Sequence, residues 1–410
     1  MYKSILIALL VVGFLYNLVK SILQRKYKDF PIPENIRDVY DEEKYKTWRA
    51  YSAENEQLSM ISEILVFVLT LAFLVFDVYA LVYNWMPGNL WVKSMLTLGS
   101  YILLTNVLML PISYVGTFRI EEKYGFNKST KKTFVGDAIK QLLIEVILLI
   151  AMYCAAEGLY AAMGNTFFVV FYAGVVVFML GMSMFSLTFQ KIFYKFTPLE
   201  EGELRTALSE MFAAEGYQMK DIYVKNASSR TTHANAFCTG LGKYKSISLD
   251  DNLVNNYTPR EITAVFAHEL AHFKHKDTAK LTAYSMLILL VMTLLIASFV
   301  LVPQISIDCG FETANIMFAV LISNSNVIGM VMTLLGIPQA IMSRKCEYRA
   351  DAFAAKKGYG KDIISALKKL HGDSLSNLNP HPMVVALEYS HPTLSQRAAA
   401  VEEEMAKLVK

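Results

Sequence analysis

Long apolar stretches alternate with polar segments along most of the chain. A helix needs about 20 mainly apolar residues to cross the hydrocarbon core of a bilayer, so these stretches predict membrane-spanning helices. The seven predicted spans are residues 5–18, 61–83, 95–118, 139–163, 167–189, 281–302 and 316–342. The first stretch could instead be a cleaved signal peptide, but no small-residue cleavage site follows it, and we interpret it as a span.

The polar segments divide the chain into four parts. Residues 1–190 hold the first five spans with their loops, and residues 191–282 form a long polar insert. Residues 283–342 hold the last two spans, and residues 343–410 are polar and mostly helical in pattern. We therefore expect a mainly α membrane protein with seven transmembrane helices. The insert and the C-terminal part would form a polar domain that carries a small β-sheet.

Composition supports a membrane setting. Hydrophobic residues make up 54% of the 410 residues and charged residues only 18%, whereas a soluble domain averages about 25% charged. The apolar excess indicates the lipid bilayer as a partner, and a net charge of +3 gives no reason to expect a nucleic acid. The cysteines show neither zinc-finger spacing nor a disulfide framework, so we expect free thiols. They are Cys154, Cys238, Cys309 and Cys346.

Basic residues are distributed unevenly among the loops. Loops 25–59 and 119–138, the insert and the C-terminal part are rich in Lys and Arg, whereas the loops on the other side hold almost none. Because cytosolic loops carry an excess of Lys and Arg, we expect the insert and the C-terminal part on the cytosolic face of a multi-pass protein. The membrane would be the endoplasmic reticulum in a eukaryote and the inner membrane in a bacterium.

Four acidic residues fall within or near the predicted spans. They are Glu63, Asp77, Glu145 and Glu157. A charge in hydrocarbon is costly, so such groups usually face a protein interior or water. A position at the end of a span explains Glu63 and Glu157, whereas Glu145 lies deeper and indicates a water-containing interior between the helices.

The polar insert contains a pentapeptide typical of a metal site, HELAH at residues 268–272. Residues four apart lie on one face of a helix, so His268 and His272 can direct two imidazoles at one point, with Glu269 beside them. In zinc metallopeptidases this H-E-x-x-H arrangement supplies two neutral histidine ligands and a carboxylate that takes a proton from water. Residues 258–261 (Thr-Pro-Arg-Glu) are typical of the start of such a helix.

A catalytic zinc ion needs a third protein ligand and one open position. The best candidate is Glu347, which follows the seventh span as His272 precedes the sixth, so neighbouring antiparallel helices would bring both to one membrane boundary. Asp351, about one helical turn further, could accept a hydrogen bond from a ligating histidine and fix its tautomer. A solvated surface carboxylate is the alternative interpretation of Glu347. Weaker ligand candidates are His275, His371, His381 and Cys346.

With these residues in place, the chain closely resembles the type I CAAX prenyl proteases, which are integral-membrane zinc endopeptidases. Besides HELAH and the segment around Glu347, the resemblance rests on four segments spread over most of the sequence. They are residues 120–130 (IEEKYGFNKST), 196–200 (FTPLE), 230–240 (RTTHANAFCTG) and 390–397 (SHPTLSQR). The resemblance implies seven spans that enclose a water-filled chamber, with one zinc ion per chain at its cytosolic end.

Two of these segments carry candidate substrate contacts. The alternation of small and aromatic residues around Asn235 and Ala236 suits a strand edge, to which an extended peptide can add by backbone hydrogen bonds. A plain hairpin strand is the alternative. The resemblance places Asn235 and Ala236 beside the scissile bond. It also implies that His391 and Arg397 reach the active site and contact the peptide backbone. A His or Arg near the metal can stabilise the oxyanion of the tetrahedral intermediate.

These residues predict metal-assisted peptide hydrolysis, with His268, His272 and Glu347 as zinc ligands and Glu269 as the general base. The resemblance implies cleavage after a prenylated cysteine, with release of the C-terminal tripeptide of a CAAX protein. A broad protease of membrane-protein quality control, like the related HtpX enzymes, is the alternative in a bacterium. A membrane scaffold or translocon-clearing partner is an alternative of another class, and the complete set of candidate catalytic residues disfavours it.

Overall fold

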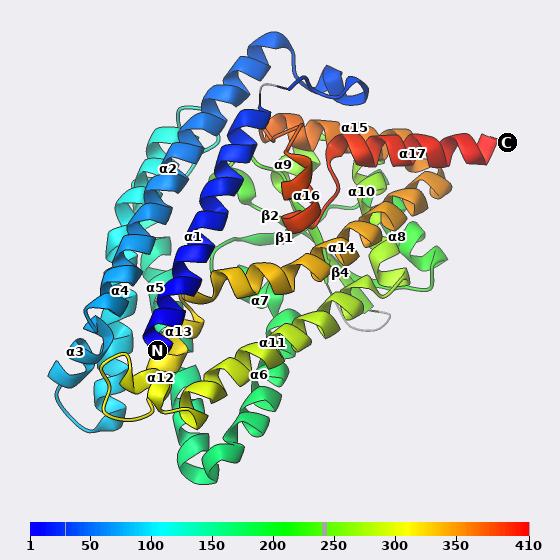
Figure 1. Ribbon diagram of the computed structural model, residues 1–410. Helices are drawn as coiled ribbons and strands as arrows, with labels where there is room; N and C mark the ends of the chain where they lie inside the picture. The colour runs from blue at the N-terminus through cyan, green and yellow to red at the C-terminus, as the bar shows by residue number, and fades with distance from the viewer. Residues whose placement is uncertain (29, 240–243, 410) are drawn as a thin grey trace.

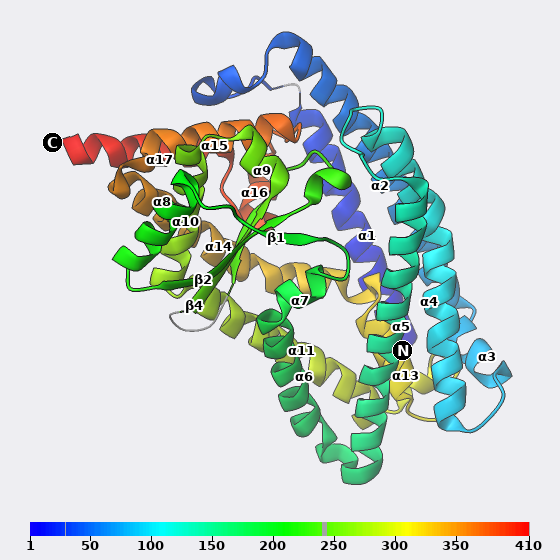
Figure 2. The same cartoon turned by 180° about the vertical axis from the view of Figure 1, so that it is seen from behind.

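The computed structural model describes residues 1–28, 30–239 and 244–409, and these are mainly helical (Figure 1). Six helices among them are long and apolar enough to cross a membrane, which makes the chain a multi-pass membrane protein. One of the six, Lys131–Met182, contains two helices that run in opposite directions in Figure 2. The count of seven crossings therefore stays a prediction. The long helices are α1 (Tyr2–Tyr27), α2 (Glu42–Val75), α4 (Leu90–Val115), α5 (Lys131–Met163), α6 (Phe167–Met184), α11 (Asp277–Leu301) and α14 (Gly329–Ala354).

Shorter helices join the long ones and build the polar domain. They are α3 (Val78–Trp85), α7 (Ser186–Gln190), α8 (Glu203–Ala214), α9 (Asp251–Asn256), α10 (Pro259–Lys274), α12 (Gln304–Ile307), α13 (Ile316–Ser323), α15 (Gly360–Asp373), α16 (Pro382–Glu388) and α17 (Leu394–Val409). In Figures 1 and 2, α8, α10, α15 and α17 lie with the sheet in one half of the molecule, and the N-terminus lies in the other half.

The sheet is small and mixed. Its strands are β1 (Phe196–Pro198), β2 (Gln218–Lys225), β3 (Ala236–Thr239) and β4 (Tyr244–Asp250), in the order β1-β2-β4-β3. The central pair, β2 and β4, is parallel, and the two outer pairings are antiparallel. β3 comes last in this order, which agrees with the strand edge predicted around Asn235. Gly240, the last residue of that segment, lies outside the described residues.

The second predicted span, residues 61–83, is wrong at its C-terminal end. α2 ends at Val75, and Asp77 has a left-handed backbone (φ 55) before α3 begins. Aspartate adopts this conformation more readily than most residues, because its short polar side chain can bond locally. Oδ1 of Asp77 lies 2.6 Å from Nζ of Lys3, so an ion pair accounts for one acidic group within the apolar stretch.

The seventh predicted span, residues 316–342, is wrong as a single helix. Residues 324–328 separate α13 from α14, because polar side chains there bond the backbone locally: Ser325 accepts a hydrogen bond from the N–H of Val327. All eight residues of α13 are buried, in an apolar cluster with residues of α1, α4 and α5. This stretch is apolar because it is a packed core segment between the long helices.

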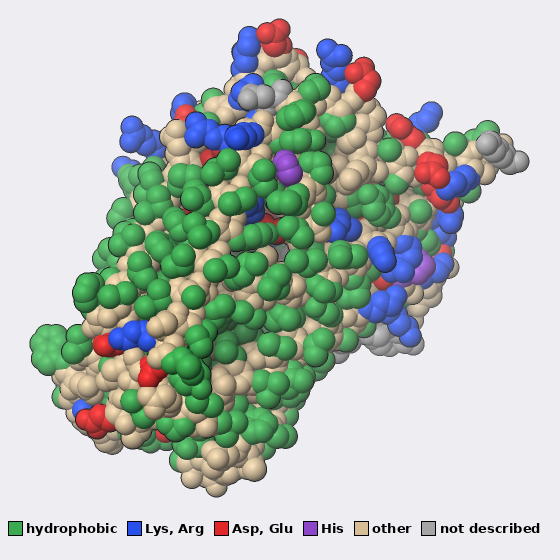
Figure 3. Space-filling view, viewed as in Figure 1, with side chains coloured by type: hydrophobic (Ala, Val, Ile, Leu, Met, Phe, Trp, Pro, Cys, Tyr) green, Lys and Arg blue, Asp and Glu red, His purple; other side chains and the backbone are tan. Residues whose placement is uncertain are grey.

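The surface of the long helices is apolar. Figure 3 shows hydrophobic side chains over the middle of the molecule, while many of the charged side chains gather around the polar domain. Glu145 is exposed, and its carboxylate accepts a hydrogen bond from the Asn106 side chain of α4 (3.0 Å). Cys154, Cys309 and Cys346 are free thiols, as predicted, and the side chain of Cys238 lies outside the description.

Candidate active site

Two helices bring the predicted metal ligands together. α10 carries His268 and His272, and α14 carries Glu347. The Nε2 atoms of His268 and His272 each lie 3.4 Å from an oxygen of Glu347. These two nitrogens are 3.1 Å apart, and ligand atoms of the three residues all lie within 4.8 Å of one another. The three side chains therefore converge on one point.

The chemistry of this group fits a metal ion. Two imidazoles and one carboxylate, with one position left open, are typical of catalytic zinc sites. Oε2 of Glu347 is buried and accepts no hydrogen bond from the described residues, although Nδ1 of His391 lies 2.9 Å away. Buried polar atoms normally have a partner, and a cation between the three ligands would supply it.

The helix with both histidines begins as its sequence predicts. The Thr258 hydroxyl accepts a hydrogen bond from the N–H of Glu261, and the Glu261 carboxylate accepts one from the N–H of Thr258. Lys369 and Ser365 of α15 also donate to this carboxylate, at 2.7 and 2.6 Å. Burial raises the pKa of Glu261, but the bonds from Lys369 and Ser365 outweigh burial and lower the pKa to about 2. α10 is thus fixed to α15 at its start.

Asp351 lies beside His268, where the sequence predicts it. Its Oδ1 is 2.8 Å from Nδ1 of His268, and Arg397 of α17 donates to both of its oxygens at 2.8 and 2.7 Å. A carboxylate only accepts a hydrogen bond, so Nδ1 carries the hydrogen. Nε2 then faces the point on which the three predicted metal ligands converge. Burial lowers the pKa of His268, but the bonds to Asp351 and Glu347 outweigh burial and raise it to about 9.

A second carboxylate, not predicted from the sequence, lies beside His272. Oδ2 of Asp277 is 3.2 Å from Nδ1 of His272, and Arg349 of α14 donates to the other oxygen. Lys276 has a left-handed backbone (φ 56), which turns the chain so that Asp277 faces the histidine. Asp277 is 1% exposed. The signal in the sequence is an acidic residue shortly after the second histidine, at the start of the next apolar helix.

His391 and Arg397 both reach the site, but their surroundings differ. The side chain of His391 is 61% exposed, with Nδ1 2.9 Å from Oε2 of Glu347. Arg397 is buried, and its Nε and Nη2 are occupied by Asp351, which leaves Nη1 3.5 Å from Glu347. Of the two, His391 is the more accessible to a substrate.

A cavity of about 180 Å³ joins these side chains to the sheet. The predicted residues that line it are Asn235, Ala236, His268, Glu269, Glu347, His391 and Arg397. Glu269 therefore lines the same cavity as His268 and Glu347. Asn235 holds the start of β3, because its carbonyl accepts from the N–H of Asp250 and its side chain accepts from the N–H of Ala236.

Two segments that carry the family resemblance contact each other next to this cavity. Asn127 pairs with Thr231 in an isolated antiparallel bridge. The ring of Phe126 stacks on His233 with the centroids 4.6 Å apart. The loop after α4 thus supports the chain immediately before the edge strand.

The weaker ligand candidates do not join the group of His268, His272 and Glu347 in the described part of the chain. Their positions explain why. Nδ1 of His371 lies 2.9 Å from the carbonyl of Leu367, His381 caps α16, His275 ends α10, and Cys346 is buried with its sulfur 3.5 Å from Arg349.

The fold and this site together define a membrane metallopeptidase, because an H-E-x-x-H helix, a glutamate from a second helix and a sheet edge meet in a protein of apolar helices. Residues 3–193 match the family model described as CAAX prenyl protease N-terminal, five membrane helices, and residues 198–405 match the model of peptidase family M48. The chain belongs to peptidase family M48 and, within it, to the CAAX prenyl proteases.

The similarity to relatives extends over most of the chain. It is 32% identical over 389 residues to "Probable CAAX prenyl protease 1" of Schizosaccharomyces pombe, covering 90% of this chain and 82% of that protein. It is 30% identical over 421 residues to the CAAX prenyl protease 1 homolog of Oryza sativa subsp. japonica, covering 98% and 97%. The crystal structure of S. mikatae Ste24p matches with a TM-score of 0.91 and 27% identity, covering 98% of this chain and 99% of that one.

Proposed function

We propose that this metallopeptidase uses zinc and cleaves CAAX proteins after a prenylated cysteine, releasing the C-terminal tripeptide. The names of the relatives support this substrate class, and a membrane enzyme suits a substrate that carries a lipid. One observation carries the catalytic part of the proposal. Glu269, two of the three convergent ligands (His268 and Glu347) and the start of β3 line a single cavity.

In this proposal His268, His272 and Glu347 hold the zinc ion. Bound zinc supplies Lewis acidity and lowers the pKa of water toward neutrality. Asp351 and Asp277 keep the hydrogen of each imidazole on Nδ1, so that each Nε2 is free to bind the metal. Glu347, which is buried, would be the third protein ligand and would leave one position on the zinc ion open for water or substrate.

The other side chains act on the substrate. An extended peptide adds to the edge of β3 at Asn235 and Ala236, which holds the scissile carbonyl in place. Glu269 takes a proton from the attacking water and passes it to the leaving amine. His391 donates a hydrogen bond to the carbonyl oxygen as negative charge develops there, and Arg397 holds Asp351 in position.

We place the active site on the cytosolic face, which in a eukaryote is the cytosolic face of the endoplasmic reticulum. The excess of Lys and Arg in loops 25–59 and 119–138 supports this orientation. The polar domain lies in the half of the molecule opposite the N-terminus (Figure 1), as the orientation requires.

The test compares a farnesylated CAAX peptide with its unprenylated twin, using the full chain in detergent and Glu269→Gln as the inactive control. Cleavage of the farnesylated peptide alone, by protein with one zinc ion per chain, supports the proposal. Equal cleavage of both peptides would instead indicate a broad membrane protease of the HtpX kind. Zinc without cleavage of either peptide contradicts the substrate class, and protein that binds no zinc contradicts the metal site.

A further inference from the structure

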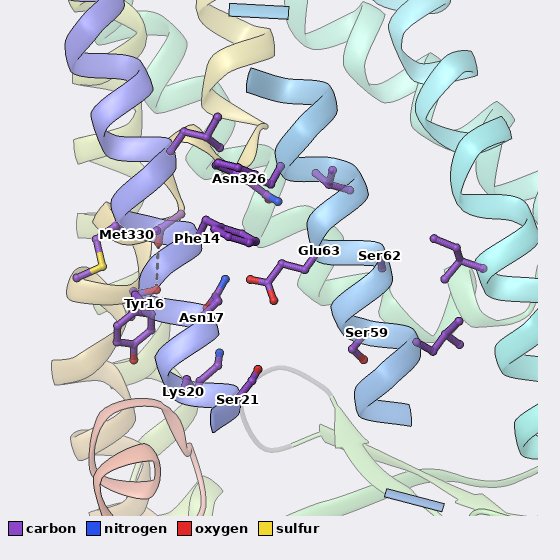
Figure 4. Close-up of a pocket in the computed structure, with 18 of the residues that line it drawn as sticks. Phe14, Tyr16, Asn17, Lys20, Ser21, Ser59, Ser62, Glu63, Asn326 and Met330 are labelled. Carbon is purple, nitrogen blue, oxygen red and sulfur yellow. Dashed lines mark hydrogen bonds between the residues drawn. The ribbon is translucent and has the colours of Figure 1, made fainter. Parts of the chain in front are cut away.

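A second cavity lies among the long helices, apart from the active site. It has a volume of about 620 Å³ and is lined by α1, α2, α4 and the region where α14 begins (Figure 4). The two cavities share no described lining residue. Its charged lining residues in the described part of the chain are Lys20 of α1 and Glu63 of α2. These two side chains decide which ligands the cavity favours.

Glu63 presents a carboxylate oxygen without a partner. Its Oε1 is buried and accepts no hydrogen bond from the described residues. Figure 4 shows the carboxylate directed from α2 into the cavity, toward Asn17 of α1. A buried carboxylate oxygen is stabilised by a hydrogen-bond donor, and most strongly by a charged one. The cavity therefore favours a ligand with a cationic donor group.

Lys20 does not fill this role. Its Nζ lies 3.2 and 3.1 Å from the two carboxylate oxygens of Glu388, and the Tyr16 hydroxyl donates to the same carboxylate at 2.8 Å. The charge of Lys20 is thus matched by Glu388 of α16, and Glu63 is left as the unmatched charge of the lining. Glu388 lies three residues before His391, so this ion pair also connects the cavity wall to the active-site segment.

The remaining lining combines apolar walls with uncharged polar groups. Phe14 and Phe67 stack with their ring centroids 4.2 Å apart. Asn17 and Asn326 place amides, and Ser59 a hydroxyl, on the same cavity. A side chain with an aliphatic stem and a cationic end is complementary to such a lining, because its stem covers apolar surface while its end meets the carboxylate.

We propose that this cavity binds a lysine or arginine side chain of the peptide substrate, at a position remote from the scissile bond. The proposal rests on the peptidase function proposed above. A phospholipid headgroup fits less well, because its phosphate needs a cation and Lys20 is already paired with Glu388. A basic peptide side chain needs only the acceptor that Glu63 provides.

The experiment uses the full-length, zinc-loaded protein and a series of farnesylated CAAX peptides. In each peptide a single lysine occupies a different position before the cysteine, and its twin carries methionine there. We expect lysine to lower KM by about tenfold at one position or two adjacent ones. In Glu63→Gln the KM ratio of the twins should fall to about one, and Glu63→Lys should favour a glutamate peptide over the lysine peptide.

Glu145→Gln is the matched control, because Glu145 is an acidic side chain of the neighbouring helix α5, pairs with Asn106 and does not line the cavity. It should keep the lysine preference. The proposal is overturned if wild type shows no lysine preference, if Glu63→Gln retains it, or if Glu63→Gln impairs both twins equally. The protein is also assayed in nanodiscs of varied phosphatidylethanolamine content. If the effect of Glu63→Gln on KM depends on this content and not on the peptide, the cavity is a lipid site and the proposal is overturned. Failure of wild type to cleave any peptide would overturn the peptidase function as well.

Discussion

Asp277 lies 3.2 Å from Nδ1 of His272 and gives the second histidine the carboxylate partner that Asp351 gives the first. Each carboxylate is held in turn by an arginine, Arg349 for Asp277 and Arg397 for Asp351. In both histidines Nε2 is therefore directed at the point on which the predicted metal ligands converge. The two histidines are therefore oriented by equivalent supports that come from different helices, α11 and α14.

Replacing either carboxylate should weaken metal binding. We expect Asp277→Asn and Asp351→Asn each to raise the zinc dissociation constant by about 10- to 100-fold, because the imidazole loses the partner that fixes its tautomer. Competition with a chromophoric chelator measures this constant. The control is Asp362→Asn. Asp362 lies in the same domain and pairs with Arg260 at 3.0 Å, and it is neither a predicted metal ligand nor one of the two carboxylates beside the histidines. Wild-type affinity in Asp277→Asn would show that His272 needs no such support.

Glu269→Gln should separate metal binding from catalysis. The three ligands remain, so zinc content should stay at the wild-type level, while loss of the base should lower kcat by about 10²- to 10⁴-fold. Metal analysis and a cleavage assay on the same sample make this comparison. Glu347→Gln is the contrasting variant, because it removes a ligand charge and should lower zinc content as well. Full activity in Glu269→Gln would falsify its assignment as the base.

Metal binding should strengthen as the pH rises from 6 toward 9. The pKa of His268 in the metal-free protein is raised to about 9, so below that pH a proton must leave before Nε2 can bind a cation. The apparent affinity should therefore fall by about tenfold for each pH unit below 9. Chelator competition across this range measures the slope. Asp351→Asn removes one of the bonds that raise this pKa and should flatten the dependence, and an equal slope in both proteins would contradict this account.

Glu261→Gln should destabilise the protein at neutral pH. The folded-state pKa of Glu261 is about 2, below its ordinary value of 4.5. A depressed pKa means that the carboxylate contributes stability above pH 4.5 and loses this contribution as the pH falls through 2. We expect a loss of about 1–3 kcal/mol at pH 7 and a smaller difference from wild type as the pH approaches 3.

Thermal unfolding in detergent at several pH values measures the effect of Glu261→Gln. Glu403→Gln on the exposed face of α17 serves as the control and should behave as wild type, because Glu403 forms an exposed surface ion pair with Lys407. A difference between Glu261→Gln and wild type that stays constant from pH 7 to pH 3 would show that the carboxylate charge is not the cause.

The convergence of His268, His272 and Glu347 could be predicted because it depends on local rules. Helical periodicity puts the two histidines on one face, and the ends of two apolar stretches bring Glu347 to the same boundary. The capping pattern at Thr258 likewise acts within a few residues. Such features need no knowledge of distant contacts.

The features that escaped prediction depend on tertiary contacts. Hydropathy does not distinguish a lipid-facing helix from a buried one, so α13 was included in a span. The turn that presents Asp277 requires a left-handed backbone at Lys276, and lysine gives no signal for it. The cavity at Glu63 is formed by helices far apart in sequence, including α1 and α14. Only their packing brings its polar and apolar walls together.

α14 runs from Gly329 in the apolar part of the chain to Ala354, beyond Glu347, and α11 carries Asp277 at its first residue and ends at Leu301 among the apolar helices. Asp277 and Glu347, which lie at the predicted metal site, are therefore carried by helices whose other ends lie among the apolar helices. A water-soluble fragment cut from this chain would lose the backbone that positions them. We therefore expect the placement of Asp277 and Glu347 to depend on the part of the chain formed by the long apolar helices.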